Sequence, residues 1–178
     1  MYQQSLFTKR INQWFVFIVA LLLLSHAGVV QSEDQKEGGL IGILTGQKIS
    51  LDTKTGKEIR ASADGVFPGD TNEYTLAYQN RETADSLKRI IIATPIPQET
   101  VWILQSAKAE IPSNLEASID GGKQYQAPPI MIPTPGPDGK EMILVEAPAE
   151  AYTHLRWILS KPLAPGSEAV VRYRVKVK

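Results

Sequence analysis

Pro68-Gly69-Asp70-Thr71-Asn72-Glu73-Tyr74-Thr75-Leu76-Ala77-Tyr78-Gln79-Asn80 is the stretch that decides the fold class. A Pro-Gly turn leads into a run in which Tyr74, Leu76 and Tyr78 alternate with polar or small residues. Successive side chains of a strand point to opposite faces, so this period of two predicts a half-buried antiparallel strand. Because weaker forms of the same alternation recur to the last residue, the sequence predicts an all-β protein.

The rest of the chain supplies the other strand signals. An N-terminal hairpin or two short strands are expected around the turn Thr53–Gly56, and prolines end the Ile90–Ile92 strand. Further strand signals are Val101–Leu104, Leu115–Ile119 before Asp120-Gly121-Gly122, Met142–Val145, His154–Leu159 and Ala169–Lys178. About 7–9 short strands separated by turns favour an antiparallel β-sandwich, with a small barrel as the alternative.

The N-terminus has the parts of a secretory signal peptide. Lys9 and Arg10 precede an apolar run from Trp14 to Leu24, and Ser25-His26-Ala27 follows. The run is shorter than the roughly 20 apolar residues of a membrane span, so cleavage near Ala27 is expected, with a second possible site after Ser32. The alternative is an uncleaved membrane anchor. Either way the sequence predicts export, to the periplasm, the cell surface or the medium.

Three segments follow from these signals. Residues 1–27 are expected to form a signal-peptide helix, residues 28–60 a leader with N-terminal strands, and residues 61–178 one β-sandwich domain. The chain has no cysteine, so no lipid anchor on cysteine and no disulfide is available. Removing Lys9 and Arg10 leaves 17 basic against 19 acidic side chains. A formal charge of −2 provides no positive surface that would attract nucleic acid or anionic lipid. We expect contact with a membrane only if the N-terminal segment is retained.

The order of the motifs resembles that of a known family. Pro68-Gly69-Asp70 and the tyrosine strand come first, a strand ending at Ile96-Pro97 follows, and Leu163–Gly166 introduces the last strand. This succession resembles the conserved-repeat modules (domain of unknown function eleven type) of exported bacterial surface proteins, over roughly residues 61–178. Thr94 replaces the acidic residue usual in that family, and Arg81-Glu82 replaces its usual Asn-x-Gly turn. The resemblance implies an Ig-like sandwich. It implies no active site, because the family has none whose residues could be assigned to this chain.

One segment differs from the strands around it. Pro128–Gly139 contains five prolines, which predict an extended, polyproline-like loop that is unable to pair in a central strand. Ile130, Met131 and Ile132 lie inside it, so we expect it either to present these side chains or to close over the sandwich. Together with Tyr125 and Tyr152, they are the residues predicted for an interaction surface. Tyr125, Tyr152 and Trp102 would form a sugar-stacking platform if exposed, although aromatic residues more often fill a core.

The sequence offers little for catalysis. His154 is the only histidine after Ala27 and no G-x-S-x-G motif is present, so neither a zinc site nor a serine triad is expected. The acids Asp64, Asp70, Asp120 and Asp138 all adjoin glycine, which is typical of turns. A basic stripe, Arg172, Arg174, Lys176 and Lys178, is interpreted as the solvated face of a terminal strand whose lysines discourage edge pairing.

These observations favour an exported, non-enzymatic module with a structural or interaction role in the cell envelope or at the surface. We expect no catalytic, cofactor-binding or metal-binding residues, and a partner that is an envelope or surface protein or a glycan. The first alternative is a carbohydrate- or polymer-binding module that uses exposed aromatic side chains or the basic stripe. A hydrolase built on loop carboxylates ranks below both.

Overall fold

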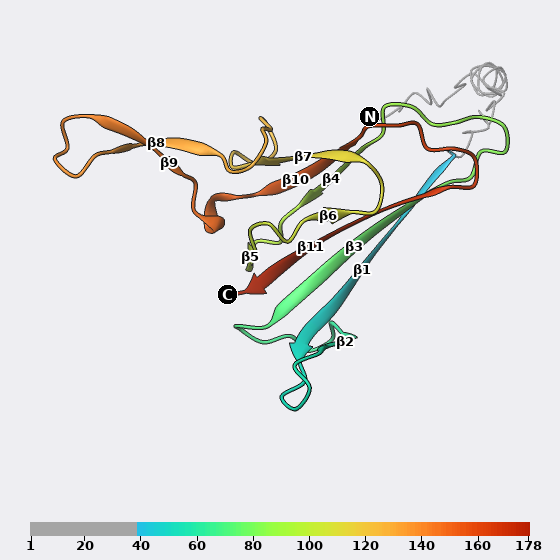
Figure 1. The fold of residues 1–178 in the computed structure, drawn as a ribbon, viewed down its shortest axis with the longest axis horizontal. Helices are drawn as coiled ribbons and strands as arrows, with labels where there is room; N and C mark the ends of the chain where they lie inside the picture. The colour runs from blue at the N-terminus through green and yellow to red at the C-terminus, as the bar shows by residue number, and fades with distance from the viewer. Residues whose placement is uncertain (1–38) are drawn as a thin grey trace, which may run out of the picture. The chain divides into compact units, whose positions relative to one another are not determined.

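A computed structural model describes residues 39–178. Within that range every regular element is a β-strand except one 3₁₀ turn, η1 (Ala149–Ala151), and the strands form antiparallel sheets (Figure 1). The predicted all-β class is thus confirmed. Eleven strands are present where 7–9 were expected, because β5 and β6 have only three and two residues and a further strand lies in the proline-rich segment. The expected signal-peptide helix lies outside the described residues.

The larger sheet is built around the two strands with the clearest alternation. In spatial order its strands are β2 (Glu58–Ser62), β1 (Leu40–Leu51), β3 (Thr71–Asn80), β11 (Glu168–Val177) and β5 (Thr100–Trp102), and β6 (Lys108–Ala109) also pairs with β11. The expected N-terminal hairpin is β1–β2, and it continues the sheet that contains β3. The domain boundary expected at residue 60 falls inside β2. The interpretation of the last strand as an edge is wrong, because β11 lies between β3 and β5.

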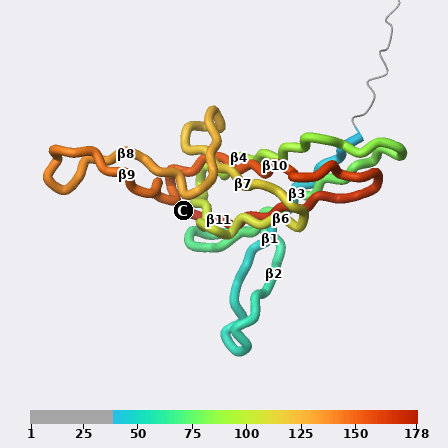
Figure 2. Tube along the Cα trace, turned by 45° about the horizontal axis from the view of Figure 1, so that its top comes forward, coloured from blue at the N-terminus to red at the C-terminus, as the bar shows by residue number. Residues whose placement is uncertain are grey.

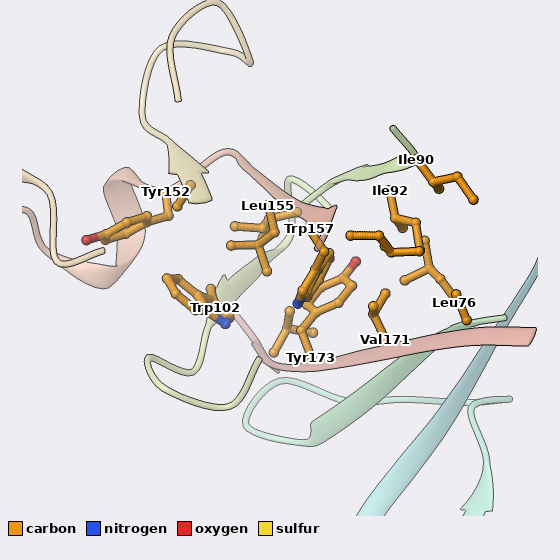
Figure 3. Close-up of a cluster of buried hydrophobic side chains, with 14 of the residues drawn as sticks. Leu76, Ile90, Ile92, Trp102, Tyr152, Leu155, Trp157, Val171 and Tyr173 are labelled. Carbon is orange, nitrogen blue, oxygen red and sulfur yellow. The ribbon is translucent and has the colours of Figure 1, made fainter. Parts of the chain in front are cut away.

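The smaller sheet faces the larger one across a single core. Its order is β4 (Ile91–Pro95), β10 (His154–Leu159) and β7 (Ser113–Ser118). Trp157 of β10 and Tyr173 of β11 meet with ring centroids 6.3 Å apart, and both are 1% exposed (Figure 3). Each fully buried large apolar side chain stabilises the fold by about 1.5–3 kcal/mol relative to exposure. The predicted alternation places apolar side chains on the inner faces of β3, β10 and β11, and these side chains form the contact between the two sheets.

Two glycines of β1 make room for the tyrosines that define β3. Gly42 lies opposite Tyr78 and Gly46 opposite Tyr74. A Cβ atom at Gly42 would come within 2.5 Å of the Tyr78 ring, and one at Gly46 within 3.2 Å of the Tyr74 ring. The rings thus cover the bare backbone of the neighbouring strand, which explains why glycine is accommodated in a strand where it packs no side chain of its own.

Asn80 closes the end of β3. Its side chain is 0% exposed, and its Nδ2 donates to the carbonyl oxygens of Asp85 (3.0 Å) and Leu163 (2.9 Å). Its Oδ1 accepts the backbone N–H of Glu82 at 3.0 Å. The amide nitrogen and the amide oxygen of Asn80 are therefore both hydrogen-bonded, and these bonds join two loops to the sheet.

A two-stranded hairpin forms the third sheet. It consists of β8 (Met131–Pro135) and β9 (Met142–Glu146), and it extends from the part that holds the core, as both views show (Figures 1 and 2). The expectation of a polyproline-like loop over Pro128–Gly139 is wrong for β8, because its prolines pair in register with β9. In the part of the chain that the structure describes, no helical segment has the length and hydropathy that a membrane crossing requires.

Candidate interaction surface

The predicted surface residues fall into two groups. Ile130 is 1% exposed and Tyr152 is 4% exposed, so both belong to the core: Ile130 packs instead of being presented, and Tyr152 fills the core. Ile132 is half-buried and packs against the same core, and Tyr125 is half-buried. Met131, which is 44% exposed, is the one member that lies open at the surface. The physical reason is that η1 turns Tyr152 inward, where its ring meets Trp102 at 5.1 Å.

The sugar-stacking platform does not form from the expected aromatics. Trp102 is 2% exposed and packs edge-on against Tyr152 inside the core. The ring of Tyr125 is covered by the guanidinium of Arg156, whose central carbon lies 4.1 Å from the ring centroid. Of the three aromatics, two are therefore buried and the third is occupied on one face by a cation.

One face of the hairpin β8–β9 is exposed along its whole length and is apolar except for Glu146 at its base. Because side chains alternate, a single face carries Met131, Pro133, Pro135, Met142, Leu144 and Glu146, all of which are exposed. Leu144 is 67% exposed and Met142 is 63% exposed. Sequence reasoning missed these two residues because the run Met142–Val145 was interpreted only as a strand. Its pairing with a proline-rich strand, which makes it part of an isolated hairpin, could be read only from the register.

The base of the hairpin is anchored in the core. The backbone N–H of Ile130 donates to the Tyr152 hydroxyl at 2.9 Å, and the N–H of Ala147 donates to the Ile130 carbonyl at 2.7 Å. Ala147 is 2% exposed and Ile130 belongs to the core cluster. An isolated two-stranded hairpin is marginally stable in water, so this buried base fixes how the exposed face is presented.

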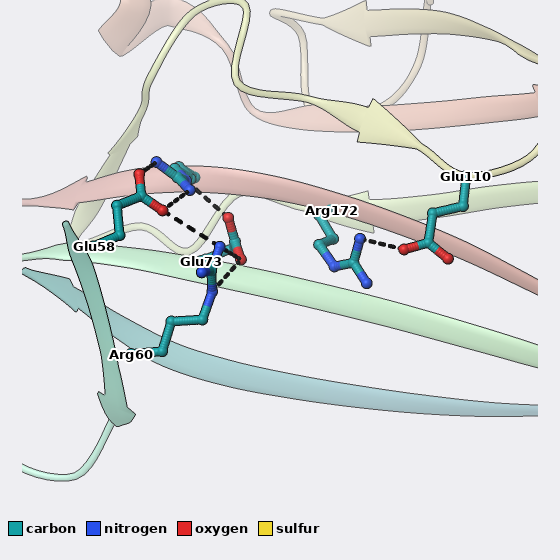
Figure 4. Close-up of polar contacts among 6 residues, drawn as sticks. Glu58, Arg60, Glu73, Glu110 and Arg172 are labelled. Atoms are coloured by element: carbon teal, nitrogen blue, oxygen red, sulfur yellow. Dashed lines mark hydrogen bonds and ion pairs between the residues drawn. The ribbon is translucent and has the colours of Figure 1, made fainter.

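The basic stripe of β11 is engaged in ion pairs. Arg174 Nε lies 2.8 Å from Glu73 and its Nη1 lies 2.7 Å from Glu58, while Arg60 contacts both acids (Figure 4). Arg172 pairs with Glu110. Burial raises the pKa of Glu73, but the hydrogen bonds and charges of Arg174 and Arg60 outweigh it, so the pKa lies below its ordinary value. With both arginines of the stripe paired to acids, the attraction of an acidic polymer to this strand is weakened.

A shallow groove lies beside this network. Its volume is about 500 Å³, and Glu58, Glu73 and Arg174 line it together with the β5–β6 loop residues Ile103–Ser106. Ser106 fixes the loop to the sheet, because its Oγ accepts the backbone N–H of Arg174 at 3.0 Å. Gln105 at the tip of this loop has a positive φ of 64°. Glu58, Glu73 and Arg174 pair with one another there, and Ile49, Leu51, Ile103 and Leu104 make much of the remaining lining apolar.

The loop acids serve their own turns, as the sequence predicts. Asp120 accepts the backbone N–H groups of Lys123 and Gln124, and Asp70 accepts that of Phe67. These hydrogen bonds hold the carboxylates in the charged form: for Asp120 the bond from Gln124 lowers the pKa most, and for Asp70 the bond from Lys48 does. Asp64 accepts the Ser62 hydroxyl, and Asp138 accepts the Lys140 N–H.

His154 is half-buried beside Thr153, with its Nδ1 3.2 Å from the Thr153 hydroxyl. Residues 39–178 contain no group of three or more histidine, cysteine or acidic side chains arranged to hold a metal ion. No family model matches this chain, and no curated protein or solved structure matches it either.

Proposed function

We propose that this chain is an exported, non-enzymatic β-sandwich module of the Ig-like class that binds a protein partner in the cell envelope or at the cell surface. The signal-type N-terminus supports export. Two antiparallel sheets that share one core support the sandwich. The order of motifs, which resembles that of conserved-repeat surface modules, supports the envelope setting.

The observation that carries the binding role is the exposed face of β8–β9. Met131, Met142 and Leu144 project from a hairpin whose base is buried, and Pro133 and Pro135 complete the same face. Contiguous exposed apolar side chains on a soluble surface mark interaction sites, because their contact with water costs free energy that a partner removes. The face has no other evident role in the fold, since the core cluster does not include these side chains.

Site-specific crosslinking tests the proposal. A photoreactive residue is placed at Leu144 in the full chain and, as the matched control, at Leu51, a strand leucine that is 65% exposed. Irradiation of intact producing cells is expected to yield a discrete protein adduct at Leu144 but not at Leu51. The adduct is identified by mass spectrometry, and the purified partner is expected to bind the wild type and to lose binding to the double variant M142K/L144K.

Two results would reject the binding role: the absence of an adduct at Leu144, or adducts of equal yield at both positions. The export component is measured separately by fractionation and N-terminal sequencing of the mature chain. We expect the chain in the envelope or the medium with a new N-terminus near residue 28. An intact chain confined to the cytoplasm would contradict export.

A further inference from the structure

The two edges of the hairpin β8–β9 differ in their hydrogen-bonding capacity. At the base, the Ala147 N–H donates to the Ile130 carbonyl, and at the tip the Gly136 N–H donates to the Glu141 carbonyl at 2.8 Å. Both pairs share the register of β8–β9, in which Ile132 faces Val145. Hydrogen-bonded and non-bonded pairs alternate along an antiparallel ladder. The backbone groups of the intervening residues therefore point outward, away from the hairpin.

These outward positions are blocked on one strand and open on the other. On β8 they are Met131, Pro133 and Pro135, and the two prolines have no N–H to donate. On β9 they are Met142, Leu144 and Glu146, and all three retain the donor. Among residues 39–178 no strand pairs with either edge. The hairpin therefore has one edge that resists strand addition and one that can accept it.

The side chains along the β9 edge of one copy are complementary to those along the same edge of a second copy. Met142, Leu144 and Glu146 alternate along β9, Lys140 lies in the turn two residues before Met142, and all four are exposed. If β9 pairs antiparallel with a second β9 about a twofold axis at Ile143, Met142 faces Leu144 of the second copy, and the turn residue Lys140 comes beside its Glu146. Each favourable pair then occurs twice.

Other registers lose this complementarity. Centring the pair on Leu144 places Met142 opposite Glu146, and centring it on Met142 places Leu144 opposite Lys140. Parallel in-register pairing places like charges side by side. The Ile143-centred antiparallel register is the one of these four that matches charge with opposite charge and apolar with apolar.

We propose that a second copy of this chain docks on β9, so that two hairpins form a four-stranded sheet in the order β8–β9–β9–β8. The inference rests on the proposed function, because it takes the exposed face of the hairpin as a protein-binding surface and names its occupant. In the dimer the apolar faces of both hairpins become continuous, and the proline-bearing strands form the two outer edges.

A charge-exchange experiment tests the register. The association of the native chain, purified from the cells that produce it, is measured by sedimentation equilibrium over a concentration series. Wild type is expected to dimerise. K140E places two acids opposite each other and E146K two bases, so each single variant is expected to dissociate about tenfold more readily. The double variant K140E/E146K restores both pairs, and so does an equimolar mixture of the two single variants, which is expected to form a heterodimer.

The substituted side chains are exposed, and thermal unfolding of each variant checks that the fold is intact. A wild type that stays monomeric throughout overturns the dimer, as does a dimer that the single variants leave unchanged. The crosslink at Leu144 separates the two proposals. An adduct with a different protein, together with a monomeric chain, leaves the proposed function standing and removes the second copy as occupant. An adduct of two copies that is lost in both single variants and regained in the double variant supports both.

Discussion

The hydroxyl of Tyr152 accepts the backbone N–H of Ile130 at 2.9 Å, 22 residues away in sequence. Ile130 immediately precedes β8 and Tyr152 immediately follows η1, so this buried hydrogen bond connects the hairpin to the core. A buried tyrosine is thus what holds the candidate binding element in place.

Tyr152→Phe keeps the ring in the core but removes the acceptor for this N–H. A buried donor left without a partner costs about 1–3 kcal/mol, so the free energy of unfolding in urea is expected to fall by that amount. The Ile130 amide is expected to exchange with solvent faster. Tyr125→Phe is the control, because it keeps the ring that Arg156 covers. Equal losses in both variants would show that the hydroxyl of Tyr152 does not anchor the hairpin.

Asn80→Asp replaces a buried amide that donates to two backbone carbonyl oxygens with a carboxylate that repels them. We expect a loss of about 3 kcal/mol at neutral pH, since an unpaired buried charge costs more than a missing hydrogen bond. The introduced carboxyl group has its pKa raised in the fold, so the penalty is expected to shrink as the pH falls through that raised value. Urea unfolding at pH 7 and near pH 5 measures this. Asn114→Asp, at an exposed position of β7, should be close to neutral. A pH-independent loss would contradict the burial of the charge.

Glu73→Gln removes the acid that Arg174 and Arg60 share. Because the pKa of Glu73 is lowered from 4.5 in the fold, its contribution is complete above that value and is lost as the pH falls through the lower folded pKa. At pH 7 the variant is expected to be about 1–2 kcal/mol less stable, a figure reduced for the partly exposed arginines. The difference from wild type should shrink on acidification. Glu168→Gln, an exposed position of β11, serves as control, and a difference that grows at low pH would refute this assignment.

Gly42→Val tests whether the Tyr78 ring occupies the space beside the glycine. The new Cβ would lie 2.5 Å from the ring, so the ring or the strand must move, at an expected cost of about 1–3 kcal/mol. Urea unfolding gives the cost, and the NMR shifts of the Tyr78 ring report its displacement. Thr45→Val, on the exposed surface of the same strand, should leave both unchanged. A Gly42 variant as stable as wild type would contradict the packing.

Local patterns predicted the strands that carry the core. The alternation around Tyr74 and Leu76, and that around Val171 and Tyr173, is present in β3 and β11 as expected. The neighbours of these strands could not be predicted, because β3 pairs with both β1 and β11 across very different sequence separations. Strand order depends on long-range packing, which a period of two does not encode.

The candidate surface was predicted only in part, for a similar reason. The segment Pro128–Gly139 was singled out correctly as unusual, yet the penalty of a proline depends on whether its missing N–H would face a neighbouring strand. That orientation follows from the register with β9, which the sequence does not display. For the same reason Met131 was expected at the surface along with Ile130, although consecutive residues of a strand face opposite ways and only Met131 is exposed.

The two prolines of β8 also limit the stoichiometry that this hairpin can support. A hairpin with two pairable edges can add copies at both ends without limit, which is how sheet fibres grow. With Pro133 and Pro135 in β8, only the β9 edge of each hairpin can add a strand, and a sheet formed by two such hairpins through β9 has a proline-bearing strand at both outer edges. The chain can therefore carry an exposed apolar hairpin while the prolines of β8 oppose the growth of a polymer from that strand.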